Sequence, residues 1–468
     1  MDERKGVELK RSLSEINVWA LALGCIVGWG AFVMPGNTFL CKAGPLGTGI
    51  AMLLSAIVLT IIAVNYNYMI NLFPISGGEF TYSDKAFGKK HAFLCAWFLG
   101  LSYLAIVPLN ATALALIGRN LMDNVFQVGF HYVIAGYDVY LGEVLLAQFA
   151  ILFLGWMSIS GVKNAGIFQT FLAIALVVGI LLVVIAALFS SKTSYQNLLP
   201  AFYPNGSALG GILAVMAVAP WAFVGFDTVP QAAEEFSFST KKTLSIMIVS
   251  IIFGAFVYVA LNTVTVSVIP AGYTTWVQYI DDLGNLSGLI SLPTFFAAKA
   301  LIGSAGLVFL GVSVLAAILS GITGFYMATS RLFYSMAREN VLPQWFGKLH
   351  EKYKTPVNSI IFIMLFSVIA PFFGRTALGW IVDMSSVGAA IGYGYTSAAA
   401  LKFAIKKDNW MIMCTGVIGV LFSCLFLVLL LIPIDGFSCS LGVESYYCLV
   451  FWIILGIIFY FTSTTRSL

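Results

Sequence analysis

The chain has 468 residues, of which 60% are hydrophobic and only 9% are charged, and its formal net charge is +4. With a mean hydropathy of +0.96, it is far too apolar to be a soluble domain of this length. The composition therefore predicts an all-α membrane protein with many spans. We expect its surroundings to be the lipid bilayer and its partner to be a small molecule rather than nucleic acid.

Residues 1–15 form a tail whose first part, Met1–Arg11, is polar and charged, and no small-residue cleavage site precedes the first apolar run. Such a tail does not have the pattern of a cleaved secretory signal. We therefore expect a cytosolic N-terminal tail.

Twelve apolar runs follow the tail, each long enough to cross a bilayer, which takes about 20 residues. They are predicted at 16–36, 46–70, 92–118, 140–160, 165–189, 208–232, 244–269, 301–327, 357–373, 377–401, 410–433 and 446–463. An even number of spans returns the C-terminus to the side of the N-terminus.

The lysines and arginines are distributed unevenly between the two sides that these spans define. Nineteen of them lie on segments expected in the cytosol and five lie on outer segments. Basic residues resist translocation, so an excess of them marks the cytosolic side. We therefore expect a multi-pass protein of the cell (plasma) membrane with both termini in the cytosol.

The first span contains a segment, Gly24–Pro35, that is poorly suited to a continuous helix. Glycines at 24, 28 and 30 each lower helix stability by about 1 kcal/mol relative to alanine, and Pro35 removes a backbone donor. Unpaired backbone at membrane depth is tolerated only where it lines an enclosed cavity. The segment is predicted to unwind and to offer N–H groups and carbonyls to a ligand with a negative and a positive group.

The sixth span repeats this feature five helices later. Residues 219–230 contain two prolines, Gly225 and the ionisable Asp227. Broken helices at corresponding positions of two halves indicate an inverted-repeat transporter that holds its substrate between the breaks. We expect a five-plus-five repeat, with residues 16–189 and 208–401 as the two repeats and residues 410–463 as an added pair of spans.

Four stretches occur in the order and spacing of one transporter superfamily. They are the glycine-rich first span, Gly225–Asp227 with Ala233–Glu235, Pro74–Tyr82, and Ser330–Pro343. Through them the chain resembles the amino acid–polyamine–organocation (APC) superfamily over nearly its whole length. The resemblance implies a five-plus-five repeat, alternating access, and amino acids or related amines as cargo.

Two positions depart from the usual pattern of that superfamily. Trp29 stands where the family usually has a small residue, and Phe236–Ser239 stands in place of a Lys-Asn-Pro-like turn. Trp29 would fill part of the pocket for a substrate carboxylate, which favours a small or atypical substrate.

The substrate carboxylate is expected at the N–H groups of Gly28, Trp29 and Gly30, at the start of the second half-helix. The alternative is that these glycines only let neighbouring helices approach closely. By the resemblance, the substrate amino group would meet carbonyls around Cys25 and Ile26.

The matching carbonyls of the sixth span, again by the resemblance, lie between Trp221 and Val224. Trp221 and Phe325 match positions of gating or substrate-stacking aromatics in the arginine/agmatine antiporters. Ordinary apolar packing is the alternative for both side chains. Tyr103 and Asn110 of the third span are further candidates for the cavity wall.

Two carboxylates, Asp227 and Asp383, are expected within the membrane, where an ionisable group is costly and a functional candidate by default. Asp227 would either titrate during transport or cap the freed N–H groups of the break. Asp383, near the outer end of its span, would act in a gate or be solvated.

The end of the sixth span carries Glu234 and Glu235, for which Arg331 and Arg338 are candidate partners in an inner gate. The alternative is a set of solvated helix ends, where such ion pairs contribute about 0–1 kcal/mol.

Energy coupling is predicted from the fifth span. In proton-coupled members of the family a lysine follows the Gly-Val-Lys motif by about thirteen residues, and Leu176 stands there in this chain. Sodium would need carbonyls of the first span and hydroxyls such as those of Ser320 and Thr323, which usually bond their own helix. We expect exchange or proton-linked movement rather than sodium symport.

Other classes of protein fit the sequence less well. A membrane-embedded enzyme needs a nucleophile and a base, or a metal, buried together, and no histidine falls in a predicted span. A channel-like carrier does not explain the paired breaks. We predict a secondary transporter, not an enzyme, with no metal and no cofactor. The sequence leaves open the substrate, the oligomeric state and a disulfide between Cys439 and Cys448.

Overall fold

The computed structural model describes residues 9–122, 125–434 and 440–464, so Cys439 and its suggested disulfide lie outside the described residues. The described chain is almost entirely helical. The long helices are α1 (Glu15–Ile26), α3 (Leu40–Leu72), α5 (Lys89–Leu121), α6 (Leu141–Ile159), α7 (Val162–Phe189), α10 (Thr243–Ser267), α13 (Ser304–Arg338), α14 (Val357–Ile369), α15 (Gly374–Lys406), α16 (Trp410–Leu431) and α17 (Val443–Thr464).

Shorter elements connect these helices. The short α-helices are α2 (Gly30–Met34), α4 (Gly78–Phe87), α8 (Ala208–Met216), α9 (Ala219–Ala222), α11 (Trp276–Asp281) and α12 (Pro293–Ile302). The π turn η1 (Pro35–Phe39) and the 3-10 turns η2 (Tyr195–Leu198), η3 (Phe226–Thr228), η4 (Pro230–Glu235), η5 (Thr240–Lys242), η6 (Leu283–Asn285), η7 (Gly288–Ser291), η8 (Gln344–Gly347) and η9 (Ala370–Phe373) complete the helical set. The strands β1 (His131–Ile134) and β2 (Tyr137–Tyr140) form an antiparallel hairpin in which His131 pairs with Tyr140.

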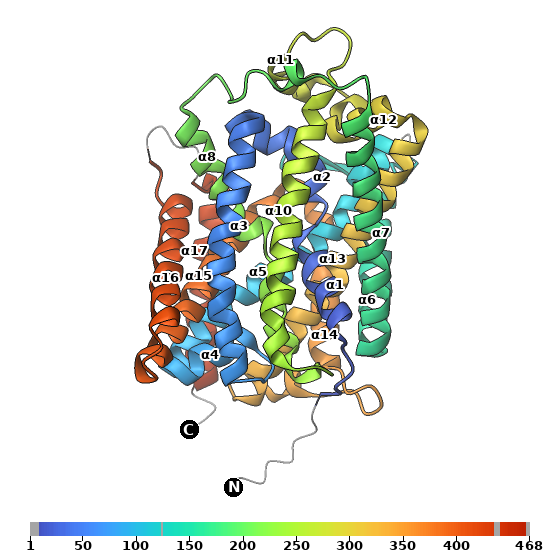
Figure 1. The fold of residues 1–468 in the computed structure, drawn as a ribbon. Helices are drawn as coiled ribbons and strands as arrows, with labels where there is room; N and C mark the ends of the chain where they lie inside the picture. Colours follow the sequence, from blue (N-terminus) through green and yellow to red (C-terminus); the bar gives the residue numbers. More distant parts are fainter. Residues whose placement is uncertain (1–8, 123–124, 435–439, 465–468) are drawn as a thin grey trace.

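The long helices stand side by side and run between two ends of one bundle (Figure 1). One end carries α11 and α12, and we name it the α11 end; the other carries α4, and we name it the α4 end. Helix α1 packs against α7, α10 and α13, which places the glycine-rich segment inside the bundle. Large apolar side chains, such as Phe149, Phe171, Leu421 and Phe461, are exposed on the outer helices α6, α7, α16 and α17. Such a surface is stable only against lipid.

Nine stretches of the described residues are long and apolar enough to cross a membrane. One of them, 15–72, covers the predicted spans 16–36 and 46–70. Another, 357–381, covers the predicted span 357–373 and the start of 377–401. The predicted span 208–232 is divided into elements that are too short to be counted. The all-α membrane architecture is thus confirmed, while the twelve-span count and the five-plus-five repeat stay predictions.

Both predicted interruptions are present as gaps in regular helix. The first is confined to Val27–Trp29, between α1 and α2. Gly24 and Gly30 remain helical, and Pro35 begins the π turn that leads into α3. The second lies at Phe223–Gly225, and the chain after it continues as the 3-10 turns η3 and η4. The second half of the sixth span is therefore a 3-10 segment and not an α-helix.

Candidate functional site

Gly225 of the second break packs against the end of α1, directly before the first break. Its φ is 149°, a conformation that residues with a Cβ rarely adopt. A Cβ on Gly225 would lie 2.6 Å from the nitrogen of Ile26 and 2.8 Å from the Cβ of Cys25. Only glycine allows this approach, so the second break lies against the last turn of α1.

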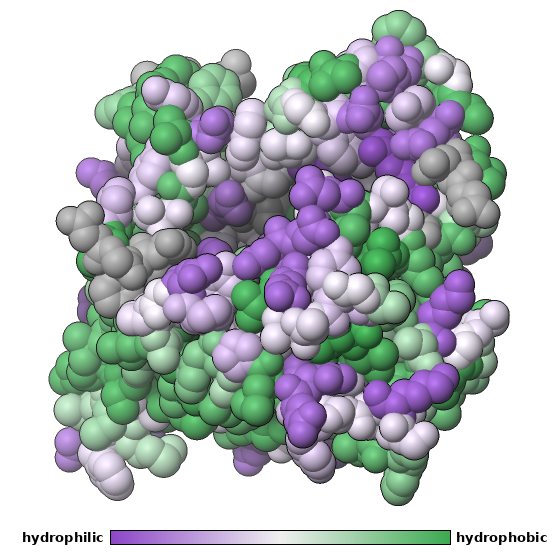
Figure 2. Space-filling view, turned by 90° about the horizontal axis from the view of Figure 1, so that it is seen from above, coloured by the Kyte–Doolittle hydropathy of each residue, from purple (hydrophilic) through white to green (hydrophobic). Residues whose placement is uncertain are grey.

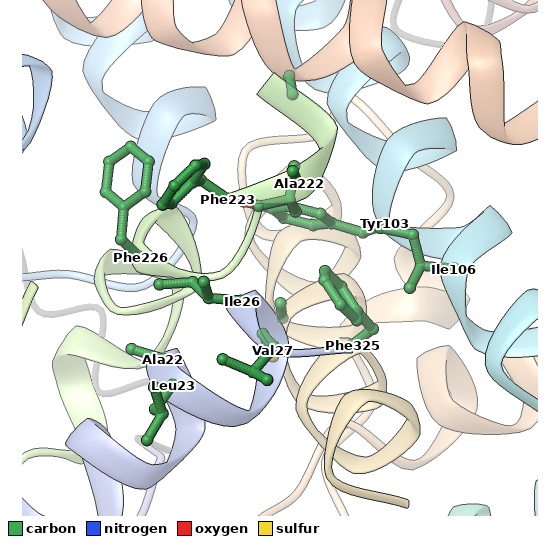
Figure 3. Packing of buried hydrophobic residues seen from close by; sticks show 14 of the residues in the cluster. Ala22, Leu23, Ile26, Val27, Tyr103, Ile106, Ala222, Phe223, Phe226 and Phe325 are labelled. Atoms are coloured by element: carbon green, nitrogen blue, oxygen red, sulfur yellow. The ribbon is translucent and has the colours of Figure 1, made fainter. Parts of the chain in front are cut away.

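A small cavity of about 20 Å³ lies between the breaks, roughly the space of one water molecule. Its lining residues come from α1, α2, α5, α9, α10 and α13 and from the breaks between them: Cys25, Ile26, Gly28, Trp29, Gly30, Ile106, Asn110, Trp221, Ala222, Val224, Tyr258 and Phe325. All eight residues predicted to bind substrate are among them. Figure 3 shows Ile26, Ala222, Ile106 and Phe325 converging from separate helices.

The first break supplies hydrogen-bond donors to this cavity. Ala31 and Phe32 donate their N–H groups to the carbonyls of Gly28 and Trp29. Among the described residues, the N–H groups of Gly28, Trp29 and Gly30 have no acceptor. Three neighbouring unpaired N–H groups suit an anionic group, because they can satisfy several of its lone pairs.

Asn110 supplies an acceptor on the opposite wall. Its side chain is 3% exposed, and its amide nitrogen donates to the Ile106 carbonyl at 3.0 Å. Its Oδ1 has no donor within the described part of the chain. A Cβ on Gly28 would lie 3.9 Å from that oxygen, so Asn110 Oδ1 faces the break. An unsatisfied buried acceptor is costly, which makes it a ready partner for a donor group that enters the cavity.

Tyr258 of α10 bridges carbonyls of both breaks. Its hydroxyl lies 3.0 Å from the Ala222 carbonyl oxygen and 3.3 Å from the Ile26 carbonyl oxygen. One hydroxyl has a single hydrogen to donate. One of the two carbonyls can therefore accept from another donor at any time.

A second, wider cavity of about 360 Å³ lies toward the α11 end, where Figure 2 shows the surface hollowed. Trp29 and Trp221 line both cavities, and their rings meet edge to face with centroids 6.4 Å apart. The guanidinium of Arg375 lies 4.1 Å from the centroid of the Trp29 ring. This tryptophan pair separates the small cavity from the wide one.

Asp383 lines the wide cavity and is exposed, and its Oδ2 accepts a hydrogen bond from Ser445 at 3.2 Å. It does not line the small cavity. Its exposed position at the wide cavity agrees with either predicted role, a gate or a solvated site.

Asp227 lies beneath the small cavity and is fully buried. Its Oδ1 accepts from the Gly225 N–H and its Oδ2 from the Tyr103 hydroxyl, both at 2.7 Å. The predicted capping geometry is therefore present. Tyr103 does not line the small cavity.

Another buried carboxyl, Glu79 of α4, stands beside Asp227. Its Oε1 accepts from the Tyr66 hydroxyl and its Oε2 from Gln231 Nε2, both at 2.7 Å. The Tyr103 hydroxyl lies 3.5 Å from Glu79 Oε1. Sequence reasoning confined to the spans missed Glu79, although the Pro74–Tyr82 motif contains it.

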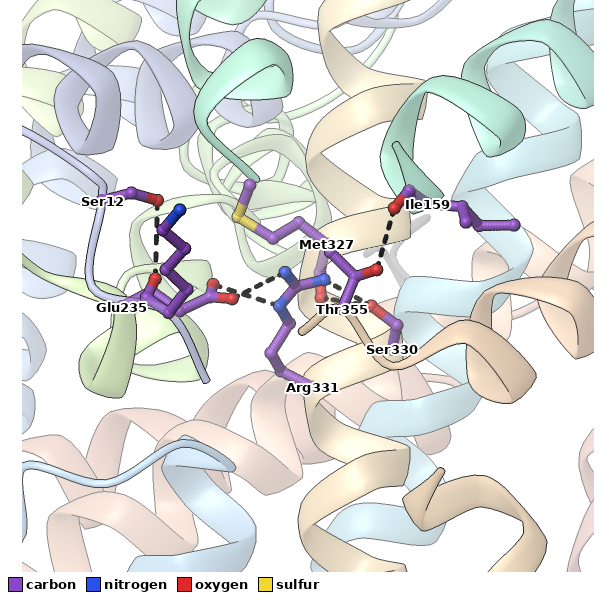
Figure 4. Close-up of polar contacts among 8 residues, drawn as sticks. Ser12, Ile159, Glu235, Met327, Ser330, Arg331 and Thr355 are labelled. Carbon is purple, nitrogen blue, oxygen red and sulfur yellow. Dashed lines mark hydrogen bonds and ion pairs between the residues drawn. The ribbon is translucent and has the colours of Figure 1, made fainter. Parts of the chain in front are cut away.

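Among the described residues, the α4 end is closed by two ion pairs, of which one is buried. Arg331 donates to both carboxylate oxygens of Glu235, at 2.8 Å and 3.2 Å (Figure 4). Both side chains are at most 2% exposed, because Ser12 and Leu13 cover Glu235 and donate their N–H groups to its carbonyl. The solvated alternative predicted for this pair is therefore wrong. A second pair joins Arg338 and Glu234 at 2.8 Å and is partly exposed.

Leu176 of α7 stands where proton-coupled members of the family carry a lysine. It is buried among apolar groups. Gln169 of the same helix donates to the Ser320 hydroxyl at 2.6 Å and lies 3.4 Å from the Ala20 carbonyl. The Thr323 hydroxyl bonds its own helix, as predicted. A neutral amide thus occupies the junction of α1, α7 and α13.

The sequence did not orient Asn110, and it did not single out Ile106, Ala222 or Tyr258. Asn110 and Ile106 are four residues apart and so share a helix face, and that spacing could have placed them together. Tyr258 is one of 20 tyrosines, and no local signal distinguishes it.

Comparison with known proteins gives one family over almost the whole chain. Residues 13–459 match a family model described as amino acid permease. The chain is 25% identical to the branched-chain amino acid permease BcaP of Bacillus subtilis (strain 168), over 98% of this chain and 94% of that protein. It is also 25% identical to the methylthioribose transporter of that organism, over 99% and 95%. A third relative, cationic amino acid transporter 4 of Mus musculus, is 24% identical over 86% of this chain and 61% of that protein.

Proposed function

The chain belongs to the amino acid permease family, and on this premise we propose that it is a secondary transporter for a neutral amino acid. The substrate site is the small cavity between the two breaks. The transporter works by alternating access, in which the cavity opens to one side of the membrane at a time.

One observation carries this proposal: unpaired donors and an unpaired acceptor face each other in one buried cavity. The N–H groups of Gly28, Trp29 and Gly30 suit the α-carboxylate of an amino acid. The Oδ1 of Asn110 suits its ammonium group. Burying either charge without partners would be costly, so the pairing of both favours a zwitterion.

The rest of the lining indicates the substrate side chain. Cys25, Ile26, Ile106, Val224 and Phe325 are apolar, and no charged side chain of the described residues lines the small cavity. A cationic side chain would be left without a counter-ion there. The relative named for branched-chain amino acids agrees better with this lining than the one named for cationic amino acids. The relative named for methylthioribose makes a small neutral non-amino-acid the second candidate.

The transport cycle moves the groups that close the cavity. A volume of about 20 Å³ is too small for an amino acid, so binding requires Trp29, Trp221 or Phe325 to turn aside. Opening toward the α11 end separates the tryptophan pair. Opening toward the α4 end breaks the Arg331 and Glu235 pair. The excess of Lys and Arg on the segments predicted as cytosolic makes the α4 end the cytosolic one.

The junction of α1, α7 and α13 bears on energy coupling. Gln169 donates to groups that a sodium ion would need, namely the Ser320 hydroxyl and a carbonyl of the first span. An amide in that place competes with a cation. We therefore expect exchange or proton-linked transport without sodium.

The test is counterflow in liposomes of purified protein loaded with unlabelled leucine. We expect saturable, stereoselective uptake of labelled leucine at equal pH and without sodium. Lysine should compete poorly, and Gly28→Leu should abolish uptake. Exchange of methylthioribose but of no amino acid would refute the substrate class, and uptake that requires a sodium gradient would refute the coupling.

A further inference from the structure

Two carboxyls lie close together beneath the substrate cavity. Glu79 and Asp227 are each 0% exposed. The hydroxyl of Tyr103 lies 2.7 Å from one and 3.5 Å from the other. The carboxyls are therefore within about 6 Å of each other, a distance at which two negative charges strongly disfavour double ionisation.

No base neutralises this pair within the described part of the chain. The titratable groups that face it come from five helices, α1, α3, α4, α5 and α15: Cys25, Tyr66, Tyr82, Cys95, Tyr103 and Tyr393. All are thiols or phenols that are neutral near pH 7. Two uncompensated buried charges would be very costly, so the arrangement is stable with one proton on the pair.

The hydrogen-bonding groups around the pair can accommodate one proton on Glu79. Asp227 accepts two hydrogen bonds from fixed donors, which favours its charged form. Gln231 is fully buried and bonds Glu79 through Nε2, while its Oε1 has no partner among the described residues. Turning this amide would bring Oε1 to Glu79 Oε2, and that contact requires a proton on Glu79. Burial, followed by the Asp227 charge, raises the pKa of Glu79 above its ordinary value.

We propose that Glu79 and Asp227 form a proton-binding site that holds one proton while the α4 end is closed and couples its release to transport. The proposal rests on the proposed transport function. It assigns a coupling role to Glu79.

The segment η4 connects this site to the closure of the α4 end. Gln231 bonds Glu79, and four residues further along the same turn Glu235 bonds Arg331. Opening the α4 end displaces η4 and admits water to Glu79. The proton then leaves toward that side, and the repulsion of the two carboxylates keeps η4 displaced.

Tyr103 connects the site to the substrate. Its ring packs against Phe325, with centroids 5.8 Å apart. It lies three residues before Ile106 on α5, and both Phe325 and Ile106 line the substrate cavity. A substrate that turns Phe325 therefore moves the phenol that bridges the carboxyls.

The first experiment detects the proton without any transport. Infrared difference spectra of the purified protein during a pH titration should show the C=O band of a buried, protonated carboxylic acid. We expect Glu79→Gln to remove this band. The matched control is Glu143→Gln, because Glu143 is also buried but is paired with Arg119. A wild-type spectrum without the band, or a band that Glu79→Gln leaves unchanged, would overturn the proposal.

The second experiment measures coupling in liposomes that contain a pH-sensitive dye. For one proton per substrate, an inward gradient of ~1 pH unit supports about tenfold accumulation. We expect Glu79→Gln to lose this accumulation and substrate-driven dye signals while keeping counterflow within about twofold. Net substrate uptake by the wild type without proton movement would overturn the coupling. Absence of counterflow with the band present would overturn the transport function and leave the proton site standing. If Glu79→Gln does not fold, the same measurements on Tyr103→Phe decide: normal proton movement there refutes the bridge.

Discussion

The unpaired amide oxygen of Asn110 offers the sharpest test of the substrate site. Asn110→Leu preserves the volume of the side chain and removes its acceptor. The side chain is 3% exposed and Oδ1 has no donor in the described residues, so the free protein loses only the bond from Nδ2 to the Ile106 carbonyl. That bond contributes about 1 kcal/mol, and the unsatisfied oxygen costs about 1–3 kcal/mol. The free energy of unfolding should therefore stay the same or rise.

Substrate affinity should change in the opposite direction. A hydrogen bond between an ammonium group and the amide oxygen contributes about 1.5–3 kcal/mol. Losing it raises the Kd roughly 10- to 150-fold, since each 1.4 kcal/mol is about a factor of ten. The variant is thus expected to be as stable as the wild type and a much weaker binder. This separation distinguishes a ligand contact from a structural one.

Titration calorimetry gives the Kd and thermal unfolding in detergent gives the stability. The matched control is Asn262→Leu on α10, because Asn262 is 1% exposed and its Oδ1 is also without a partner in the described chain. It does not line the substrate cavity, so its affinity should equal that of the wild type. Wild-type affinity in Asn110→Leu, or equal losses in the two variants, would refute the reasoning.

Three further outcomes follow from the structure. Gly28→Leu should abolish binding and leave a folded, monodisperse protein, because a Cβ there meets only Asn110 Oδ1 of the described residues, at 3.9 Å, and the rest of the side chain takes the space that the substrate must open; binding at wild-type affinity would contradict this. The pKa of Glu79 is higher in the folded protein than in the unfolded chain, where it is about 4.3. The contribution of its proton to stability is therefore fully present below the unfolded pKa and is lost as pH rises through the folded pKa. Melting temperatures from about pH 5 to about pH 9 should fall less steeply in Glu79→Gln, and parallel curves would count against it. Arg331→Met should cost about 3–5 kcal/mol by leaving Glu235 buried and unpaired, and adding Glu235→Leu should restore much of that loss, as denaturant titration would measure; an additive loss in the double variant would exclude the buried pair.

The sequence determined the class of protein because hydropathy is a summed property of long segments. The all-α membrane architecture is confirmed, and so is membership of the amino acid permease family within the APC superfamily. The two breaks were also predictable. Glycine and proline disfavour helix through the backbone itself, whatever their neighbours are.

The tertiary structure decided which residues of the predicted interruptions unwind and how the polar groups pair. Gly24 stays helical, and a Cβ there would collide with the Ser320 hydroxyl, so its role is close packing. Tyr258 and Asn110 join the cavity only because α10 and α5 present them to the same break.

The buried charges show the same division. The sequence places Glu79 between spans and Arg331 at the end of one, and composition cannot say whether such a residue is solvated or enclosed. The contacts of α4 and η4 bury Glu79 beside Asp227, and those of η4 and α13 bury Arg331 against Glu235. A charge acquires its partner and its proton from groups distant in the chain, so the sequence alone determines the breaks and only the packed bundle determines what fills and surrounds them.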